Sequence, residues 1–226
     1  MTVRARLLFF GGFFATIILL IVVVAVVSAR GPNTLKYGGP PIIEGERYVT
    51  DEFKPAFSFE AVGEGWTLDG PEGPFYLALS NRGSFLDFMN IEDFTVFDPN
   101  GADRVPLPED LVGWYQQHPY LDTEEPEPVS IGGVKGVYFD AVMTILPEGH
   151  PLACEDPAAE GVSLNLLSAP DGYVLCLTPQ QKVRIILLED VKGAPVSIML
   201  WSDAVNFEEF LPRAEKLLKT VKWESA

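Results

Sequence analysis

An uncharged run of 21 residues, Leu7–Val27, constrains this chain more than any other feature of its sequence. At ~1.5 Å per residue, a helix of that length spans about 31 Å, which matches the hydrocarbon thickness of a bilayer. A helix that is apolar on every side needs apolar surroundings on every side, and a small protein rarely buries such a helix in its core. We therefore predict a transmembrane helix over residues 7–28, preceded by a cytoplasmic tail over residues 1–6.

A cleaved signal peptide is the main alternative to this membrane anchor. Val27-Ser28-Ala29 has the small-residue spacing that a signal peptidase accepts, and Arg4 and Arg6 form a basic region before the apolar run. The run is longer than the ~7–15 residues of an ordinary signal-peptide hydrophobic region, which favours an uncleaved anchor. Because a short basic tail stays on the cytoplasmic side, we predict a single-pass cell-membrane protein with an extracytoplasmic C-terminal domain.

The charge of the chain changes sign at the end of this segment. The first 30 residues hold three of the 16 basic residues (Arg4, Arg6 and Arg30) and none of the 32 acidic ones. The other 13 basic residues, set against 32 acidic residues, leave residues 31–226 with a net charge of −19. Nucleic acids and anionic lipid headgroups are polyanions, so this part of the chain is a poor partner for both. We expect no nucleic acid partner and a domain held out in solvent.

Residues 29–56 are predicted to be a stalk between the anchor and a folded domain. This segment holds four glycines and four prolines, including Gly38-Gly39-Pro40-Pro41, and that composition resists helix formation. Tyr48 and Phe53 are too apolar for a fully solvated linker, so we expect part of the segment to pack on the domain. The domain itself is predicted to cover residues 57–226, a length that suits one domain.

The pattern over this region predicts an α+β domain, in which an antiparallel sheet is packed with two helices. Phe57, Phe59 and Ala61 alternate with polar residues, which is typical of a half-buried strand. Further apolar runs bounded by turn residues predict strands over 75–79, 85–89, 94–97, 129–131, 137–146, 173–177, 183–188 and 196–201.

Two helices are predicted beside these strands. The first begins at Pro108 and ends before Pro119. The second is a long C-terminal helix with one apolar face, formed by Phe207, Phe210, Leu211, Ala214, Leu217, Leu218 and Val221. Asn206, with Glu209 three residues later, has the pattern of a capping box. Pro212 would then lie in the second turn, so we expect a bent first turn or a start nearer Glu208.

Three groups of residues resemble extracytoplasmic PsbP-like domains, with the LpqN-type lipoproteins of actinobacteria as the nearest group. They are Phe57 with Gly65-Trp66, the segment Pro126–Gly133, and the C-terminal pattern that runs from Phe210 to Trp223. The resemblance covers about residues 57–224 and implies an antiparallel sheet flanked by helices. The chain departs from those lipoproteins in having an apolar helix where they carry a lipid-modified cysteine. The resemblance implies no functional residues.

The chain has two cysteines, Cys154 and Cys176. An even number of cysteines in an oxidising compartment favours a disulfide, so we predict a Cys154–Cys176 bond. Closing a loop of that length stabilises a fold by roughly 3 kcal/mol in the chain-entropy model. If the domain were cytoplasmic, two free thiols would be the alternative.

No catalytic, cofactor-binding or metal-ligating residue is predicted. The sequence lacks the Gly-x-Ser-x-Gly, His-Glu-x-x-His and phosphate-binding Gly-x-x-x-x-Gly-Lys patterns. The two histidines, His118 and His150, have no partner at metal-ligand spacing. We interpret His118 as an imidazolium at the end of a helix and His150 as a solvated turn residue. The segment Asp98–Asp103 has residue types that suit calcium, but its spacing is that of a turn.

Four aromatic residues, Trp66, Trp114, Tyr115 and Trp201, are candidates for a ligand pocket between helix and sheet, although aromatic residues in such positions are usually core. We therefore expect a membrane-anchored extracytoplasmic domain that works by binding or scaffolding. Its partner would be an unidentified protein or a small apolar ligand. The alternative is an extracytoplasmic hydrolase-like enzyme without a recognisable motif.

Overall fold

The computed structural model describes residues 32–38, 40–70, 72–99, 103–147, 149–150, 153–154 and 163–224. The predicted tail and transmembrane helix, residues 1–6 and 7–28, lie outside these residues and remain predictions. Among the described residues, no helix combines the length and the apolar character needed to cross a membrane. The chain divides into two compact units, Met1–Asn33 and Thr34–Ala226, and the fold below is that of the second.

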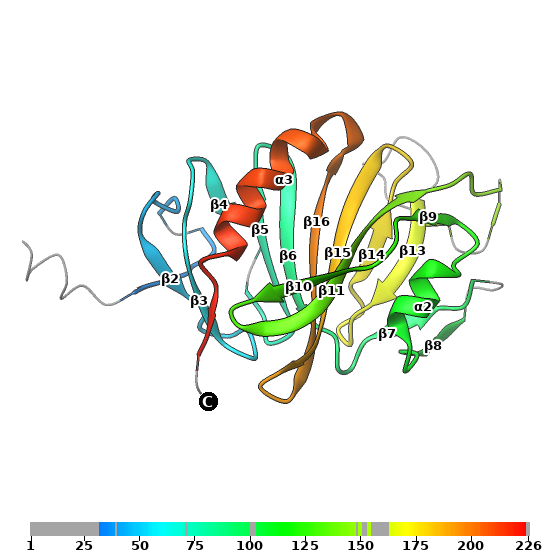
Figure 1. The fold of residues 1–226 in the computed structure, drawn as a ribbon, viewed down its shortest axis with the longest axis horizontal. Helices are drawn as coiled ribbons and strands as arrows, with labels where there is room; N and C mark the ends of the chain where they lie inside the picture. Colours follow the sequence, from blue (N-terminus) through cyan, green and yellow to red (C-terminus); the bar gives the residue numbers. More distant parts are fainter. Residues whose placement is uncertain are drawn as a thin grey trace, which may run out of the picture. The chain divides into compact units, whose positions relative to one another are not determined.

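A mainly antiparallel sheet organises the second unit (Figure 1). Its strands follow the order β10-β11-β15-β16-β6-β5-β4, and β9 also pairs with β11. The strands are β4 (Trp66–Leu68), β5 (Tyr76–Asn81), β6 (Ser84–Asn90), β9 (Leu121–Thr123), β10 (Glu127–Ile131), β11 (Val134–Met143), β15 (Gln181–Val191) and β16 (Ala194–Asp203). All but β4 and β9 were predicted at least in part by an apolar run.

Two smaller sheets pack with the central one. The first has the order β1-β2-β3-β17, with β1 (Asn33–Thr34), β2 (Arg47–Val49), β3 (Phe57–Glu60) and β17 (Lys222–Trp223). The second has the order β12-β13-β7-β8, and β14 also pairs with β13; its strands are β7 (Thr95–Phe97), β8 (Arg104–Pro106), β12 (Ala153–Cys154), β13 (Ser163–Ser168) and β14 (Val174–Leu177).

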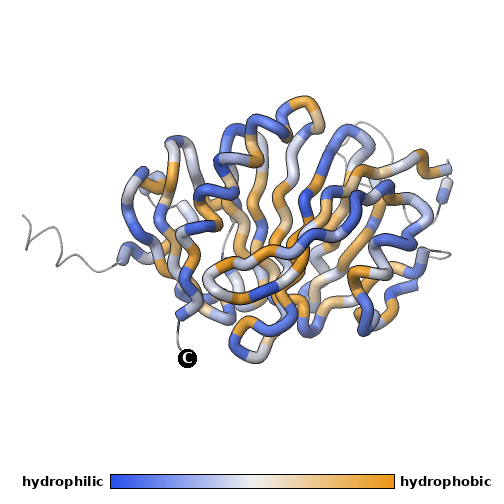
Figure 2. The backbone as a smooth tube through the Cα atoms, viewed as in Figure 1, coloured by the Kyte–Doolittle hydropathy of each residue, from blue (hydrophilic) through white to orange (hydrophobic). Residues whose placement is uncertain are grey.

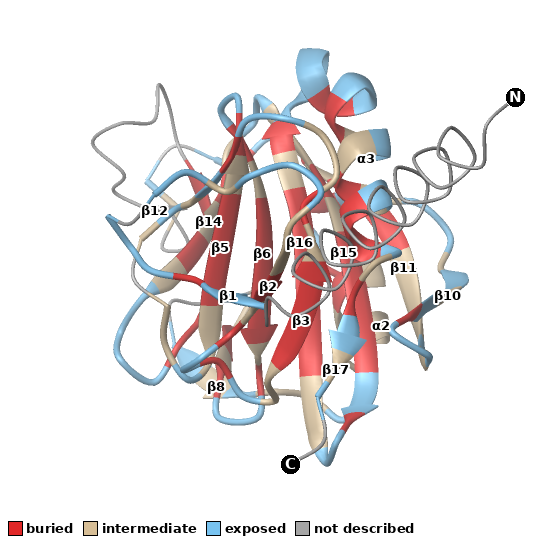
Figure 3. Cartoon of the chain, turned by 90° about the vertical axis from the view of Figure 1, so that its left-hand side faces the viewer, coloured by how far each residue is buried: buried red, intermediate tan, exposed pale blue. Residues whose placement is uncertain are grey.

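The central sheet is buried on both faces. Along β15, Ile186 and Leu188 belong to one hydrophobic core, whereas Ile185 and Leu187 belong to the other. Because successive side chains of a strand point to opposite faces, a strand covered on both sides is apolar throughout rather than alternating. Figure 2 shows this as orange stretches along the inner strands, and Figure 3 shows the same strands as buried.

Helix α3 (Ala204–Leu218) covers one face of the sheet (Figure 1). The predicted apolar face is confirmed for five of its seven residues, since Phe207, Phe210, Ala214, Leu217 and Leu218 are buried. Leu211 is half-buried, and Val221 is buried just after the end of the helix. The capping-box prediction at Asn206 is wrong: the N-cap is Asp203, and its side chain makes no capping hydrogen bond. Pro212 lies inside the helix, on its exposed side, where solvent replaces the backbone partner that a proline removes.

Helix α2 (Leu111–Gln116) packs in the second core and is shorter than the predicted helix from Pro108. The chain enters it through Asp110, whose carboxylate accepts a hydrogen bond from the Gly113 amide at 2.7 Å. Because this aspartate caps the first turn, the helix begins at Leu111, three residues after the predicted start at Pro108. The predicted α+β class is confirmed, with sheet as the dominant element and two helices among the described residues.

The predicted stalk belongs in part to the folded unit. Strand β2 pairs with β3, with Tyr48 opposite Phe59, and Tyr48 and Phe53 are buried. The ring of Phe53 meets Phe57 edge-on at 5.6 Å between ring centroids. Burial of these rings fixes a segment whose glycines and prolines alone suggested a loose coil, so the compact unit begins near Thr34 rather than at residue 57.

Candidate functional site

A tight hairpin between β5 and β6 contributes the first side chains of the candidate site. Asn81 pairs with Ser84, which leaves a loop of Arg82 and Gly83. Their φ angles are +55° and +81°, the left-handed values that a two-residue hairpin loop of this type needs at both positions. Glycine adopts such values freely, but an arginine rarely does. The turn therefore holds the Arg82 side chain at the hairpin tip in a strained backbone.

The loop between β3 and β4 forms the neighbouring wall. The indole Nε1 of Trp66 donates a hydrogen bond to the Val62 carbonyl at 3.0 Å, which folds the loop back on the ring. The carboxylate of Glu44 accepts a hydrogen bond from the Gly63 amide at 3.1 Å and ties the β1–β2 connection to the same loop. The β3–β4 loop lies beside the β5–β6 hairpin because β4, β5 and β6 are neighbours in the central sheet. The β1–β2 connection joins them through the Glu44–Gly63 hydrogen bond.

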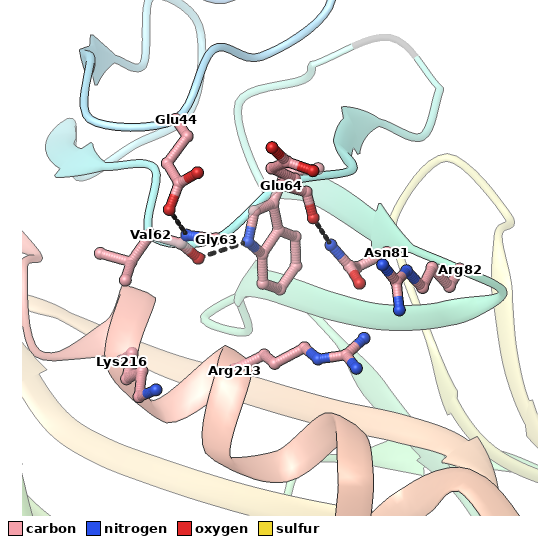
Figure 4. Close-up of a pocket in the computed structure, with 9 residues that line it drawn as sticks. Glu44, Val62, Gly63, Glu64, Asn81, Arg82, Arg213 and Lys216 are labelled. Atoms are coloured by element: carbon pink, nitrogen blue, oxygen red, sulfur yellow. Dashed lines mark hydrogen bonds between the residues drawn. The ribbon is translucent and has the colours of Figure 1, made fainter.

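Helix α3 supplies the opposite wall through Arg213 and Lys216. Residues three apart lie on the same side of a helix, and Figure 4 shows Arg213 extending toward the hairpin while Lys216 lies farther from Arg82. The resulting cavity has a volume of about 360 Å³ and is lined by Glu44, Val62, Gly63, Glu64, Trp66, Asn81, Arg82, Arg213 and Lys216. Figure 4 shows the ends of Arg82 and Arg213 directed toward each other, with the amide of Asn81 beside the end of Arg82.

The cavity gathers positive charge in a strongly acidic domain. Three of the 13 basic residues after residue 30 line it: Arg82, Arg213 and Lys216. Arg213 also pairs with Glu209 one turn earlier on α3, an exposed pair of the kind that contributes little to stability. Of the two lining carboxylates, Glu44 is held by the Gly63 amide and Glu64 is exposed. The Arg82–Arg213 end of the cavity is therefore the cationic end, and we call this cavity the cationic cavity.

Asn81 has an unused hydrogen-bonding atom at this end. Its side-chain nitrogen donates a hydrogen bond to the Glu64 carbonyl at 2.9 Å, which fixes the orientation of the amide. Its Oδ1 atom has no hydrogen-bond partner within the described residues, and it is shielded from solvent because the residue is only 2% exposed. Leaving a buried acceptor unsatisfied costs about 1–3 kcal/mol, so such atoms are rare and usually meet water or a ligand.

A second cavity, of about 520 Å³, lies where the entry to α2 meets β11, β15 and β16. Its floor is apolar and includes Leu107, Leu111, Val137, Leu187 and Val196. The carboxylates that line it, Glu92, Glu109, Asp110 and Glu189, are exposed, and no basic residue is among its lining residues. This groove has the apolar surface that the sequence-based ligand hypothesis called for, but different residues form it.

The groups with the most perturbed pKa values lie outside both cavities. Burial raises the pKa of Asp87 to about 7, and its Oδ2 accepts a hydrogen bond from the Trp201 indole at 2.7 Å. Burial lowers the pKa of His118 to about 4, so this imidazole is neutral at pH 7. The interpretation of His118 as a charged helix-end residue is therefore wrong, because its ring is buried against Trp114 at 5.0 Å between centroids.

The four predicted pocket aromatics are not brought together. Trp66 belongs to the core under α3 and lines the cationic cavity, with its ring 6.2 Å from that of Phe210. Trp114, Tyr115 and Trp201 belong to the core on the other face of the central sheet. Trp201 stacks on Phe85 at 4.4 Å, and Tyr115 packs on Phe139 at 5.5 Å. These three are core residues, and none of them lines either large cavity.

The cysteines lie on strands of one sheet. Cys154 is in β12 and Cys176 is in β14, and both strands pair with β13. The chain between residues 155 and 162, within the loop that the predicted disulfide would close, lies outside the described residues. The Cys154–Cys176 bond stays a prediction.

Comparison with known proteins gives little further information. No family model matches the chain, and no curated protein matches it. The chain is similar to the solution structure of a cyanobacterial PsbP, CyanoP, from Synechocystis sp. PCC 6803. The identity is 11%, the TM-score is 0.38, and the alignment covers 84% of this chain and 98% of that one. A likeness at this level carries no conclusion about function.

Sequence reasoning found only Trp66 among the residues of the cationic cavity. Asn81-Arg82-Gly83-Ser84 between two predicted strands does carry a hairpin signal, which would have placed Arg82 at a turn. Arg213 and Lys216 are readable as neighbours on one helix face. Their meeting with Arg82 is not readable, because it depends on which strands lie beside α3.

Proposed function

We propose that this protein is a membrane-anchored extracytoplasmic binding domain that takes a small anion in the cationic cavity. The observation that carries the proposal is that Arg82, Arg213 and Lys216 all line one cavity, with the two guanidinium groups directed toward each other, in a domain that is otherwise strongly acidic. Its volume of about 360 Å³ falls in the range of small-molecule sites. Guanidinium groups are suited to carboxylate and phosphate because their N–H donors match two oxygens at once.

The acidic surroundings make this concentration of cations selective. A field of negative charge repels anions from most of the surface, so an anion is held only where cationic groups lie close together, as the guanidinium groups of Arg82 and Arg213 do. Arg82 is also held in a backbone conformation that destabilises the fold. Such strain is concentrated at functional sites, and here it positions a charged side chain at the mouth of a cavity.

A hydrolase-like enzyme remains the alternative class, and the location of the titratable groups argues against it. An active site places groups with shifted pKa values at a cavity where a substrate can reach them. Asp87 and His118, whose pKa values are shifted, are buried in the core and line neither cavity. The cationic cavity offers groups for binding rather than for proton transfer at neutral pH.

Isothermal titration calorimetry of the full-length protein in detergent, with inorganic phosphate and with propanoate, tests the proposal. Replacing Arg213 by glutamine should weaken binding about tenfold, and Lys216→Gln about threefold, in line with a loss of ~0.5–1.4 kcal/mol. Lys219→Gln is the matched control, because it removes the same charge from the end of the same helix but outside the cavity. Equal weakening by Lys216→Gln and Lys219→Gln, or no binding by the wild type, would refute the proposal.

The membrane anchor and the extracytoplasmic location are proposed from the sequence. The apolar run over Leu7–Val27 and the basic residues before it support both. Intact cells are treated with a reductant and then with a membrane-impermeant thiol reagent. We expect labelling of Cys154 and Cys176 without lysis, and labelling only after lysis would place the domain inside.

A small apolar ligand in the second cavity is a further candidate function. The apolar floor formed by residues such as Leu107 and Leu111 supports it. A neutral solvatochromic dye such as Nile red should bind the wild-type protein and bind less to Leu107→Gln, a change at a half-buried position. Equal dye binding by both proteins would contradict this assignment.

A further inference from the structure

Asn81 narrows the class of anion that the cationic cavity can take. This inference rests on the proposed function, because it concerns the same cavity. The Asn81 amide has one orientation, since its nitrogen donates to the Glu64 carbonyl at 2.9 Å and its oxygen must then point the other way. Figure 4 shows that oxygen on the side of the amide that faces Arg213 and Arg82.

The electronic character of this oxygen decides what it can contact. A carbonyl oxygen only accepts hydrogen bonds, so a bare carboxylate or phosphate oxygen offers it nothing and is repelled by it. The atom is buried and has no partner within the described residues. A ligand that places an O–H or N–H beside its anionic group would satisfy the Asn81 oxygen and the cations together.

The rest of the cavity suits a ligand of mixed charge. Figure 4 shows Glu44 across the cavity from Arg82, so a carboxylate lies at the end away from the two arginines. Gly65 precedes Trp66 in the wall beside Asn81, and its φ of +87° suits glycine.

We infer that the cavity selects small organic anions that carry a hydroxyl or amino group next to the anionic group. Hydroxy acids and amino acids are both members of this class. The anionic group lies between Arg82 and Arg213, and the neighbouring O–H or N–H donates to Oδ1 of Asn81. A site that hydrogen-bonds a ligand group discriminates against the analogue that lacks it, because the protein atom is then left unpaired.

Three probes with the same carbon skeleton test this inference: propanoate, lactate and alanine. They carry no donor, a hydroxyl donor and an ammonium donor, respectively, beside the carboxylate. Each is titrated into the full-length protein in detergent while the indole N–H signal of Trp66 is followed by NMR. We expect lactate, alanine or both to bind at least fivefold more tightly than propanoate, and the stronger of the two identifies the donor.

The possible outcomes separate this inference from the proposed function. Equal affinity for all three probes, or tighter binding of propanoate, would overturn the role of Asn81 while leaving an anion site. No binding of any probe, with phosphate also failing in calorimetry, would overturn both. Asn81→Leu should abolish the preference over propanoate and leave propanoate affinity within twofold. If that variant does not fold, the comparison of the three probes on the wild-type protein still decides.

Discussion

Arg82 combines a structural disadvantage with a place at the cationic cavity. Its φ of +55° is destabilising for any residue except glycine, asparagine or aspartate. Lys192 is in the same situation in the β15–β16 hairpin, where it has a φ of +57° and Gly193 follows it. Only Arg82 lines the cavity. The two residues therefore allow the strain and the binding role to be separated.

Arg82→Asn and Lys192→Asn should each stabilise the protein by about 0.5–1 kcal/mol, because asparagine tolerates left-handed backbone values. Thermal unfolding measures this as a rise in Tm of roughly 1–4 °C for a chain of this size. Arg82→Asn should also weaken phosphate binding about fivefold, whereas Lys192→Asn should not. Unchanged phosphate affinity in Arg82→Asn would remove this residue from the site.

Asp87 should make the stability of the fold depend on pH. Burial raises its pKa from 3.8 to about 7, so folding favours the protonated form. The stability contributed by that form is fully present below pH 3.8 and is lost as the pH rises to about 7. Asparagine cannot ionise and keeps an oxygen for the Trp201 indole N–H.

We expect Asp87→Asn to gain stability relative to the wild type as the pH rises from 4 to 7, by up to ~1.4 kcal/mol per pH unit. Urea unfolding at several pH values measures the difference. Asp93→Asn, at an exposed position, is the control and should show no such trend. A stability difference that is constant between pH 4 and pH 7 would mean that Asp87 is ionised in the folded protein throughout.

At the scale of elements, close approach between strands sets limits that the residue pattern does not reveal. Gly136 in β11 lies against the backbone of β15, and a Cβ atom there would collide with the Leu187 carbonyl oxygen and come within 2.7 Å of Leu188 Cδ2. Both neighbours are fixed, one as backbone and the other as a buried side chain. The two strands therefore meet only if this position is glycine.

Gly136→Ala should destabilise the protein by about 2–3 kcal/mol, which is typical of overpacking against a rigid neighbour. Gly73→Ala is the matched control, since the nearest atom to its Cβ would be the Tyr76 carbonyl oxygen at 3.9 Å, an ordinary contact. Chemical denaturation of both variants gives the comparison. If Gly136→Ala is as stable as Gly73→Ala, the strands have room that the structure does not show.

The predicted disulfide is also a prediction at this scale. Strand β13 lies between β12 and β14, so a Cys154–Cys176 bond would link two strands that do not pair with each other. Intact mass spectrometry after alkylation, with and without reductant, tests it. Two alkylated thiols in the unreduced protein would contradict the bond.

For the whole molecule, the α+β class and most strands could be predicted because both follow from local patterns. The apolar runs at Val183–Leu188 and Val196–Trp201 predicted β15 and β16, and the C-terminal apolar face predicted the buried side of α3. The docking of part of the stalk was predicted from the apolar character of Tyr48 and Phe53, and their burial confirms it. The start of the compact unit near Thr34 could not be predicted, because it depends on the pairing of β2 with β3.

The candidate site shows the same division between local and long-range information. Arg82 and Asn81 come from one hairpin and Arg213 and Lys216 from one helix, and each pair is visible locally. Their meeting requires α3 to lie over the β4–β5–β6 edge of the central sheet, an arrangement that no local pattern encodes (Figure 1). The aromatic residues chosen from the sequence were hydrophobic enough to be core, and all four belong to one of the two cores, although Trp66 also lines the cavity.

The claim that the cationic cavity binds small anions is tested most directly by NMR of arginine side chains during a phosphate titration. The Nε–H signals of Arg82 and Arg213 should shift together with one dissociation constant. Arg184 does not line the cavity, and its Nε lies 2.6 Å from Oδ1 of Asp140. Its Nε–H chemical shift should not change. Absence of any shift at Arg82 and Arg213, or an equal shift of all arginine signals, would contradict the account.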